Sequence, residues 1–200
     1  MHLIVPFAGV LSEAGRQALA ALRLPPLAAL LARMGPPERD AGDEFALSPP
    51  HERALARALG WAGSDGRLPL AARAAAADGL DPGDLAWAQL TPVHQHVGTE
   101  QVSLADPAAL ALDEAASREV FELVRPLFES EGFVLAWGAP LRWYAAHEAL
   151  AEVPAASLDR VVGRNIDAWL PSHKSTRLIR RLQNEVQMLL HTHELNERRE

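Results

Sequence analysis

Three potential metal ligands lie close together in the stretch TPVHQHVGTEQVSL, residues 91–104. They are His94, His96 and Glu100. Side chains alternate between the two faces of an extended strand, so these three share a face if the stretch is extended. Two imidazoles and one carboxylate form the ligand set of non-haem iron and related sites. The spacing therefore allows a divalent metal at this place.

A structural interpretation explains the same residues without a metal. At the end of a strand, Thr91 and His94 can satisfy backbone groups while His96 packs against a neighbour. Short motifs of this kind match by chance in many proteins. We expect the structural role and no cofactor, and we keep a divalent metal held by His94, His96 and Glu100 as the alternative.

A second group of polar residues lies towards the end of the sequence. Arg164, Asn165 and Asp167 flank an expected bend, and Asn184 and Glu185 lie in the middle of an expected helix. Together they would form a pocket suited to an anionic small molecule. They would serve equally well as a polar network that ties the last helix to the body, because structural ion pairs perturb charged groups as binding sites do. Both interpretations stay open at this point.

No sequence motif marks a nucleophile. The chain has no cysteine and contains no Gly-x-Ser-x-Gly, no phosphate-binding loop and no His-Glu-x-x-His. Ser48 precedes Pro49 and an expected helix, in an order typical of a helix N-terminus. We expect Ser48 to cap that helix rather than to attack a substrate.

Composition excludes several classes of partner. The 200 residues carry a net charge of −7 at pH 7, which disfavours binding to nucleic-acid phosphates. No apolar run reaches the roughly 20 residues that a membrane span requires, and the first residues lack the basic segment of a signal peptide. We expect a cytoplasmic protein with neither a membrane nor a nucleic-acid partner.

The expected elements form a single α/β domain over residues 1–200, rich in helix. His2–Ala8 is an apolar run of the kind found in buried strands. Ser12 is placed to cap a helix over residues 13–24, and a further helix is expected over residues 27–34. A strand followed by a helix is typical of an α/β layer.

The segments that follow are also defined by local signals. A surface loop is expected over about residues 35–48, where proline, glycine and charge combine. The next helix ends at Gly60 and places Leu55 and Leu59 on one face, as in a core stripe. Another alanine-rich helix is expected to end at Gly79.

The second half of the chain contains the strongest helix signals. A helix capped by Asp113 is expected to bury a stripe that includes Phe121, and Pro126 should kink or interrupt it. A β-hairpin is expected over about residues 133–145. A final helix is expected over about residues 175–196, with leucines and a valine repeating at helical spacing.

Several segments resemble one bacterial family over nearly the whole chain. The family is that of the RpfE-like regulatory proteins, whose members are often identified as cofactor-independent phosphoglycerate mutase-like. The resemblance lies in DEFALSPPHERALARALG, LTPVHQHVGTEQVSL, LFESEGFVLAWGAPLRWYA, SLDRVVGRNIDAWLP and RLQNEVQMLLHTHELNERRE.

The resemblance implies a distant relation to the alkaline-phosphatase-like α/β fold, in a degenerate or truncated form. That superfamily needs an aspartate metal ligand at the end of its first strand, where this chain has Pro6 and Phe7. We therefore expect a regulatory protein that binds a small anionic metabolite or a protein partner, and we assign no catalytic residue. The alternative is a metal-dependent phosphoglycerate mutase-like isomerase or phosphoesterase that uses His94, His96 and Glu100.

Overall fold

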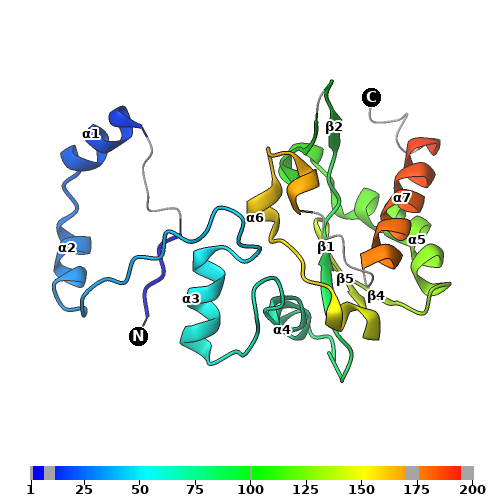
Figure 1. The fold of residues 1–200 in the computed structure, drawn as a ribbon, viewed down its shortest axis with the longest axis horizontal. Coiled ribbons are helices and arrows are strands. Elements are labelled where there is room, and N and C mark those ends of the chain that lie inside the picture. Colours follow the sequence, from blue (N-terminus) through cyan, green and yellow to red (C-terminus); the bar gives the residue numbers. More distant parts are fainter. Residues whose placement is uncertain (1, 7–11, 100, 170–175, 195–200) are drawn as a thin grey trace.

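The computed structural model describes residues 2–6, 12–99, 101–169 and 176–194. They form a mixed α/β structure with antiparallel sheets (Figure 1). The helices are α1 (Glu13–Ala21), α2 (Pro25–Leu31), α3 (Pro50–Leu59), α4 (Leu70–Ala77), α5 (Glu114–Glu129), α6 (Leu158–Val161) and α7 (Thr176–His191). The strands are β1 (Trp87–Leu90), β2 (Gln95–Val97), β3 (Val102–Leu104), β4 (Val134–Ala139) and β5 (Arg142–Ala146). Short 3-10 helices are η1 (Pro107–Leu110), η2 (Glu148–Glu152) and η3 (Ile166–Trp169).

The central sheet has the strand order β1-β5-β4, and both pairs are antiparallel. β4 and β5 form the hairpin expected over residues 133–145, with Trp137 opposite Trp143. β2 and β3 form a separate two-stranded ribbon. No helix among the described residues has the length and apolar character needed to cross a membrane.

The core lies between one face of the central sheet and the helices α5 and α7 (Figure 1). Phe121 of α5 packs edge-to-face on Trp143 of β5, with ring centroids 5.3 Å apart. Phe128 and Leu182 bring α5 and α7 together over Ala145. The helical stripes expected in both helices are therefore confirmed. Full burial of each large side chain contributes about 1.5–3 kcal/mol to the stability of the fold.

Ser117 joins α5 to the hairpin through three hydrogen bonds. Its hydroxyl accepts from the indole Nε1–H groups of Trp137 and Trp143, each at 3.0 Å, and donates to the carbonyl of Pro140 at 2.9 Å. The side chain is completely buried. One small hydroxyl thus satisfies a buried indole donor, a partly buried indole donor and a turn carbonyl, as buried polar groups require.

The opposite face of the sheet holds α4 through a second polar group. Asp78, the C-cap of α4, accepts two hydrogen bonds of 2.9 Å from Arg142 and one of 2.7 Å from the Tyr144 hydroxyl. Gly138 leaves room for this contact, because a Cβ atom there would lie 2.5 Å from Asp78 Oδ2. The Asp78 carboxylate therefore leaves no room for any side chain at position 138.

The N-terminal prediction was wrong in the described residues. Residues 2–6 form no strand, and Leu3 and Val5 are exposed; positions 7 and 8 lie outside the described residues. A strand needs a neighbouring strand for its backbone hydrogen bonds, and an apolar run does not specify one. The helix expected after Ser12 is present, and Gly15 N–H donates to Ser12 Oγ at 3.1 Å.

Three local predictions about the helices also need correction. Leu55 and Leu59 are exposed. The buried residue of α3 is the small Ala56 instead. Ser48 does not cap α3, because Pro49 occupies the N-cap position. Pro126 does not interrupt α5, which continues to Glu129; the kink expected as the alternative stays a prediction.

Several other boundaries agree with the sequence, whereas α1 ends at Ala21, α2 ends at Leu31 and α7 ends at His191, each before the expected residue. Residues 35–48 contain no helix or strand, and Gly60 ends α3 in the left-handed conformation with φ 67°. Asp113 caps α5 by accepting from Ala116 N–H at 2.8 Å. The last helix is described over Thr176–His191; Ser175 and residues 195–196 lie outside the described residues.

Candidate functional site

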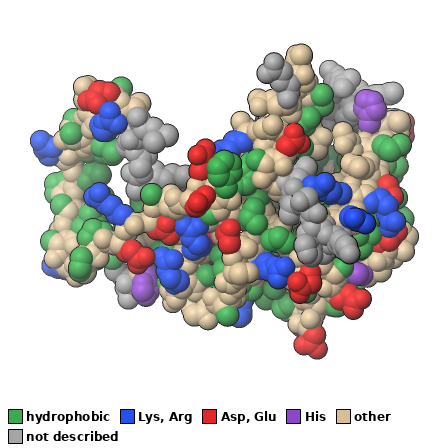
Figure 2. Space-filling view, in the orientation of Figure 1, with side chains coloured by type: hydrophobic (Ala, Val, Ile, Leu, Met, Phe, Trp, Pro, Cys, Tyr) green, Lys and Arg blue, Asp and Glu red, His purple; other side chains and the backbone are tan. Residues whose placement is uncertain are grey.

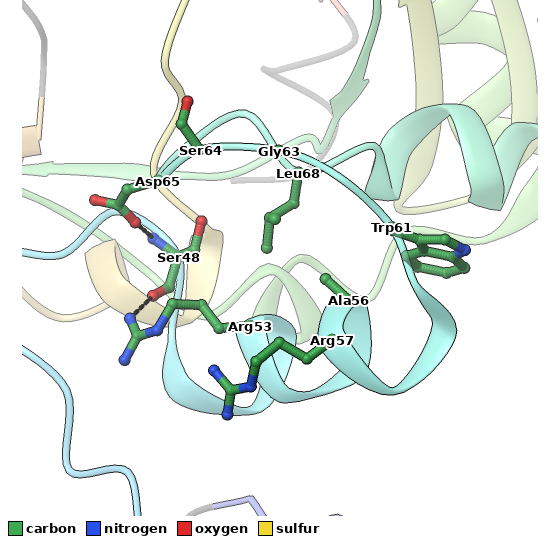
Figure 3. A pocket seen from close by; sticks show the side chains of 9 residues that line it. All are labelled: Ser48, Arg53, Ala56, Arg57, Trp61, Gly63, Ser64, Asp65 and Leu68. Atoms are coloured by element: carbon green, nitrogen blue, oxygen red, sulfur yellow. Dashed lines mark hydrogen bonds between the residues drawn. The ribbon is translucent and has the colours of Figure 1, made fainter.

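A small cavity of about 180 Å³ lies between α3 and the loop that follows it (Figure 3). Ser48 and Asp65 hold the wall of this cavity together. Asp65 accepts from the backbone N–H groups of Leu47 and Ser48, both at 2.8 Å, and Ser48 Oγ accepts from Gly66 N–H at 2.9 Å. The hydroxyl of Ser48 is thus used by the backbone, although at a different place from the expected cap.

Two arginines of α3 line the same cavity, and each is paired with an acid from the loop before it. Arg53 makes hydrogen bonds of 2.9 and 3.0 Å to Asp40, and Arg57 makes one of 3.0 Å to Glu38. The hydrogen bond from Arg53 is the largest influence that lowers the pKa of Asp40. These pairs neutralise the positive charge, and the cavity is smaller than the roughly 300–1,000 Å³ of most small-molecule sites. The arrangement therefore fits a joint between loop and helix.

The acidity of Asp65 follows from its hydrogen bonds. Burial alone would raise its pKa, but the amides of Ser48 and Leu47 stabilise the carboxylate and bring the pKa below the ordinary value of 3.8. A lowered carboxyl pKa adds stability above the ordinary value, and this stability is lost as the pH falls through the lowered pKa. Asp65 should therefore stabilise the protein at neutral pH and cease to do so in acid.

This pH dependence can be measured by urea unfolding of Asp65→Asn. At pH 7 the variant should lose about 0.5–1.5 kcal/mol, because an amide cannot accept both backbone hydrogen bonds and water partly replaces the lost one. The difference from wild type should shrink as the pH falls below the ordinary carboxyl value. Glu44→Gln is the matched control, since Glu44 is also exposed but uses only its backbone carbonyl as an acceptor among the described residues. A difference that stays constant from pH 7 to acid would contradict the assignment.

His94 and His96 lie next to each other on the surface. Their ring centroids are 4.8 Å apart in an edge-to-face arrangement, and both residues are exposed. Glu100 lies outside the described residues, so the three-ligand set stays a prediction. Within the described ranges, no group of three histidines or acids is placed to hold a metal ion.

The other predicted cluster lies on separate elements. Arg164 is exposed, with its guanidinium 5.8 Å from the ring centroid of Trp169, and Asn165 accepts from Asp167 N–H at 3.1 Å. Asn184 is exposed on α7, and Glu185 pairs with Arg181 of the same helix at 3.6 Å. In the described part of the chain, no hydrogen bond or ion pair joins the first three residues to the last two. The anion pocket built from all five stays a prediction.

The polar groups that fasten the fold had no signal in the sequence. Arg160 donates to the carbonyl groups of Asp43, Glu44 and Ala46 and holds the end of the surface loop. Burial, followed by the hydrogen bond to Asp78, raises the pKa of Tyr144 to about 12, so its hydroxyl stays protonated. Each partner lies more than 60 positions away in the sequence, where no periodic pattern reaches.

The least expected feature is the N-terminal arm, residues 12–34. α1 and α2 lie apart from the rest of the protein, and neither helix buries a residue (Figure 1). Hydrophobic side chains cover much of the surface of this segment (Figure 2). The large ones, each between 38% and 52% exposed, are Leu19, Leu22, Leu24, Leu27, Leu30 and Leu31.

Comparison with known proteins gave no relative. No protein-family model, no curated protein and no solved structure matches the chain.

Proposed function

We propose that this chain is a regulatory binding protein and that its working surface is the N-terminal arm. The observation that carries the proposal is the composition and exposure of α2. Its sequence, PPLAALL, contains no polar side chain, yet none of its residues is buried. A helix that is apolar on all sides belongs in contact with other protein surface.

The two helices are too short to be stable alone. α1 has 9 residues and α2 has 7, whereas an isolated helix in water is marginal below about 12–15 residues. Helices of this length depend on packing for their stability. A partner that covers the leucines would supply that packing.

The accessible surface of the chain supports the same conclusion. It is 13330 Å², against about 9,200 Å² expected for a compact monomer of 21.7 kDa. The excess of about 4,000 Å² is well above the roughly 800 Å² that one partner contributes to a standard interface. The chain therefore exposes enough surface for a large interface.

The regulatory role also agrees with the resemblance to the RpfE-like family, which stays a prediction along with its mutase and alkaline-phosphatase-like implications. The serine, arginine and aspartate side chains at the Ser48 cavity bind backbone groups and one another, which favours a structural use. The metal-dependent isomerase or phosphoesterase remains the alternative, favoured by the adjacent His94 and His96 rings.

Photo-crosslinking tests the proposal. A photoreactive amino acid at Leu27 should give a covalent adduct with protein in living cells, because the leucine face is in contact with a partner. The adduct should disappear when Leu30 and Leu31 are changed to glutamate. The same photoreactive residue at Met188, which is 72% exposed on α7, is the matched control and should give little adduct. If Leu27 yields no adduct above that control, the arm is not a binding surface.

A further inference from the structure

The protein also presents an apolar groove of a kind that could receive such an arm. The groove, called here the edge groove, has a volume of about 440 Å³ and lies between the loop before β1 and the strand β4. Its apolar lining includes Leu80, Pro82, Leu85, Trp87, Val134 and Ala136. Leu85 and Val134 are 45% and 53% exposed. The groove is thus open to an apolar partner.

The wall of the edge groove is ordered before any partner binds. Trp87 Nε1–H donates to the carbonyl of Pro82 at 2.7 Å, and Gly83 N–H donates to Asp81 at 3.1 Å. The ring of Trp87 also packs edge-to-face on Tyr144, with centroids 6.2 Å apart. A groove that is already formed costs less conformational entropy to fill.

Charge complementarity indicates what fills the groove. Asp81 and Asp84 line it, and neither has a salt bridge among the described residues. Arg23 and Arg33 stand on either side of α2. Among the described residues, Arg23 donates only to backbone carbonyls and no acid pairs with Arg33. The arm has three arginines and one glutamate, whereas the whole chain has a net charge of −7. A basic, leucine-rich arm therefore matches an apolar groove with an acidic rim.

The arm does not reach the edge groove of its own chain in this structure. Figure 1 shows α3 and α4 between the arm and the central sheet. The proline pair Pro36–Pro37 in the connecting loop favours an extended chain there. An arm held away from its own body is placed to contact a second molecule.

We infer that the partner is a second copy of this chain, and that each arm docks its leucines into the edge groove of the other copy. This inference rests on the proposed function of the arm and names its partner. This exchange of arms between two copies produces two equivalent contacts related by a two-fold axis, the commonest symmetry of protein dimers. The leucines would be covered on both arms at once, and Arg23 and Arg33 would approach Asp81 and Asp84.

A mixing experiment with the full chain tests the exchange. The first variant, called the arm variant, carries Leu27→Glu and Leu31→Glu and has an arm that cannot dock. The second, called the groove variant, carries Leu85→Glu and Val134→Glu and has a groove that cannot receive an arm. Each variant alone should be monomeric by sedimentation velocity at micromolar concentration, and wild type should be dimeric. An equimolar mixture should regain a dimer, because the intact arm of one variant fits the intact groove of the other.

Two controls keep this result interpretable. Met188→Glu changes an exposed apolar residue outside both surfaces and should remain dimeric. Circular dichroism should show that both double variants keep the unfolding transition of the body and lose no more helix than α1 and α2 contribute. High salt should weaken the wild-type dimer, because the arginine–aspartate contacts are screened.

The outcomes separate this inference from the function on which it rests. A mixture that stays monomeric would overturn the exchange, and so would a groove variant that is dimeric on its own, because its intact arms would then be pairing with each other. A wild-type chain that is monomeric, while Leu27 crosslinks to a different protein in cells, would also overturn the exchange but leave the arm as a binding surface. A monomeric chain with no adduct from Leu27 would contradict both.

Discussion

Replacement of Ser117 by alanine is expected to lower the free energy of unfolding by about 3 kcal/mol, because three hydrogen bonds lose the same hydroxyl. The hydroxyl of Ser117 is the hydrogen-bond partner of two indole N–H groups and one carbonyl, all within 3.0 Å. Alanine leaves the buried Trp143 indole, and the partly buried Trp137 indole and Pro140 carbonyl, without this partner. Urea unfolding of the variant measures the loss as a lower transition midpoint.

Ser130→Ala is the matched control for this prediction. Ser130 also stands at the α5 helix and also donates to a carbonyl, that of Leu127 at 2.9 Å, but it is exposed. Water replaces that hydrogen bond, so the cost should stay within about 0.5 kcal/mol. Equal, small effects of the two substitutions would show that Ser117 does not hold the hairpin to α5.

The second large effect is expected for Gly138→Ala, at about 2–3 kcal/mol. The added Cβ would lie 2.5 Å from Asp78 Oδ2 and 2.7 Å from a ring carbon of Tyr144. Neither neighbour can yield easily, because Asp78 is held by Arg142 and the Tyr144 ring is buried. Either the contact between α4 and the sheet opens, or β4 shifts away from it.

A double-mutant comparison distinguishes a steric clash of the added Cβ from a general destabilisation of strand β4. Asp78→Ala removes one of the two obstructing groups, so Gly138→Ala should cost less in that background than in wild type. Gly35→Ala, where a Cβ would meet nothing within 4 Å, should be nearly neutral. Strict additivity of the Asp78 and Gly138 changes would refute the steric explanation.

The sequence predicted those elements whose signals are local. The spacing of Phe121, Val124 and Phe128 in α5 and of the leucines in α7 specified buried faces, and both faces are buried. The hairpin followed from two apolar runs around a Gly-Ala-Pro turn. In each case the side chains that define the element lie close together in the sequence.

The interactions that assemble the elements could not be predicted in the same way. Asp78 and Arg142 are 64 residues apart, and Ser117 looks like any other polar residue of a helix until the two tryptophans are placed. Leu55 illustrates the reverse error, because helical periodicity identifies an apolar face but not whether a neighbour covers it. Local patterns define faces, while the partners of those faces depend on the whole topology.

The candidate site residues also divide into those that a local pattern could bring together and those that it could not. The rings of His94 and His96 lie 4.8 Å apart, although His94 precedes strand β2, and their use as metal ligands stays a prediction. The cluster around Arg164 was assembled from two segments whose meeting no local pattern specifies. The leucines of the arm indicated helix, but their exposure became visible only in the three-dimensional arrangement.

Hydrogen exchange of the arm tests most directly whether α1 and α2 are a surface covered by a partner. Amides of residues 13–31 should exchange slowly in the assembled protein, because packing stabilises helices that would otherwise open readily. The same amides should exchange at nearly unprotected rates in the Leu27→Glu, Leu31→Glu variant, while amides of α5 are unchanged. Arm amides that exchange at unprotected rates in wild type, or that remain protected in the variant, would contradict a partner-bound arm.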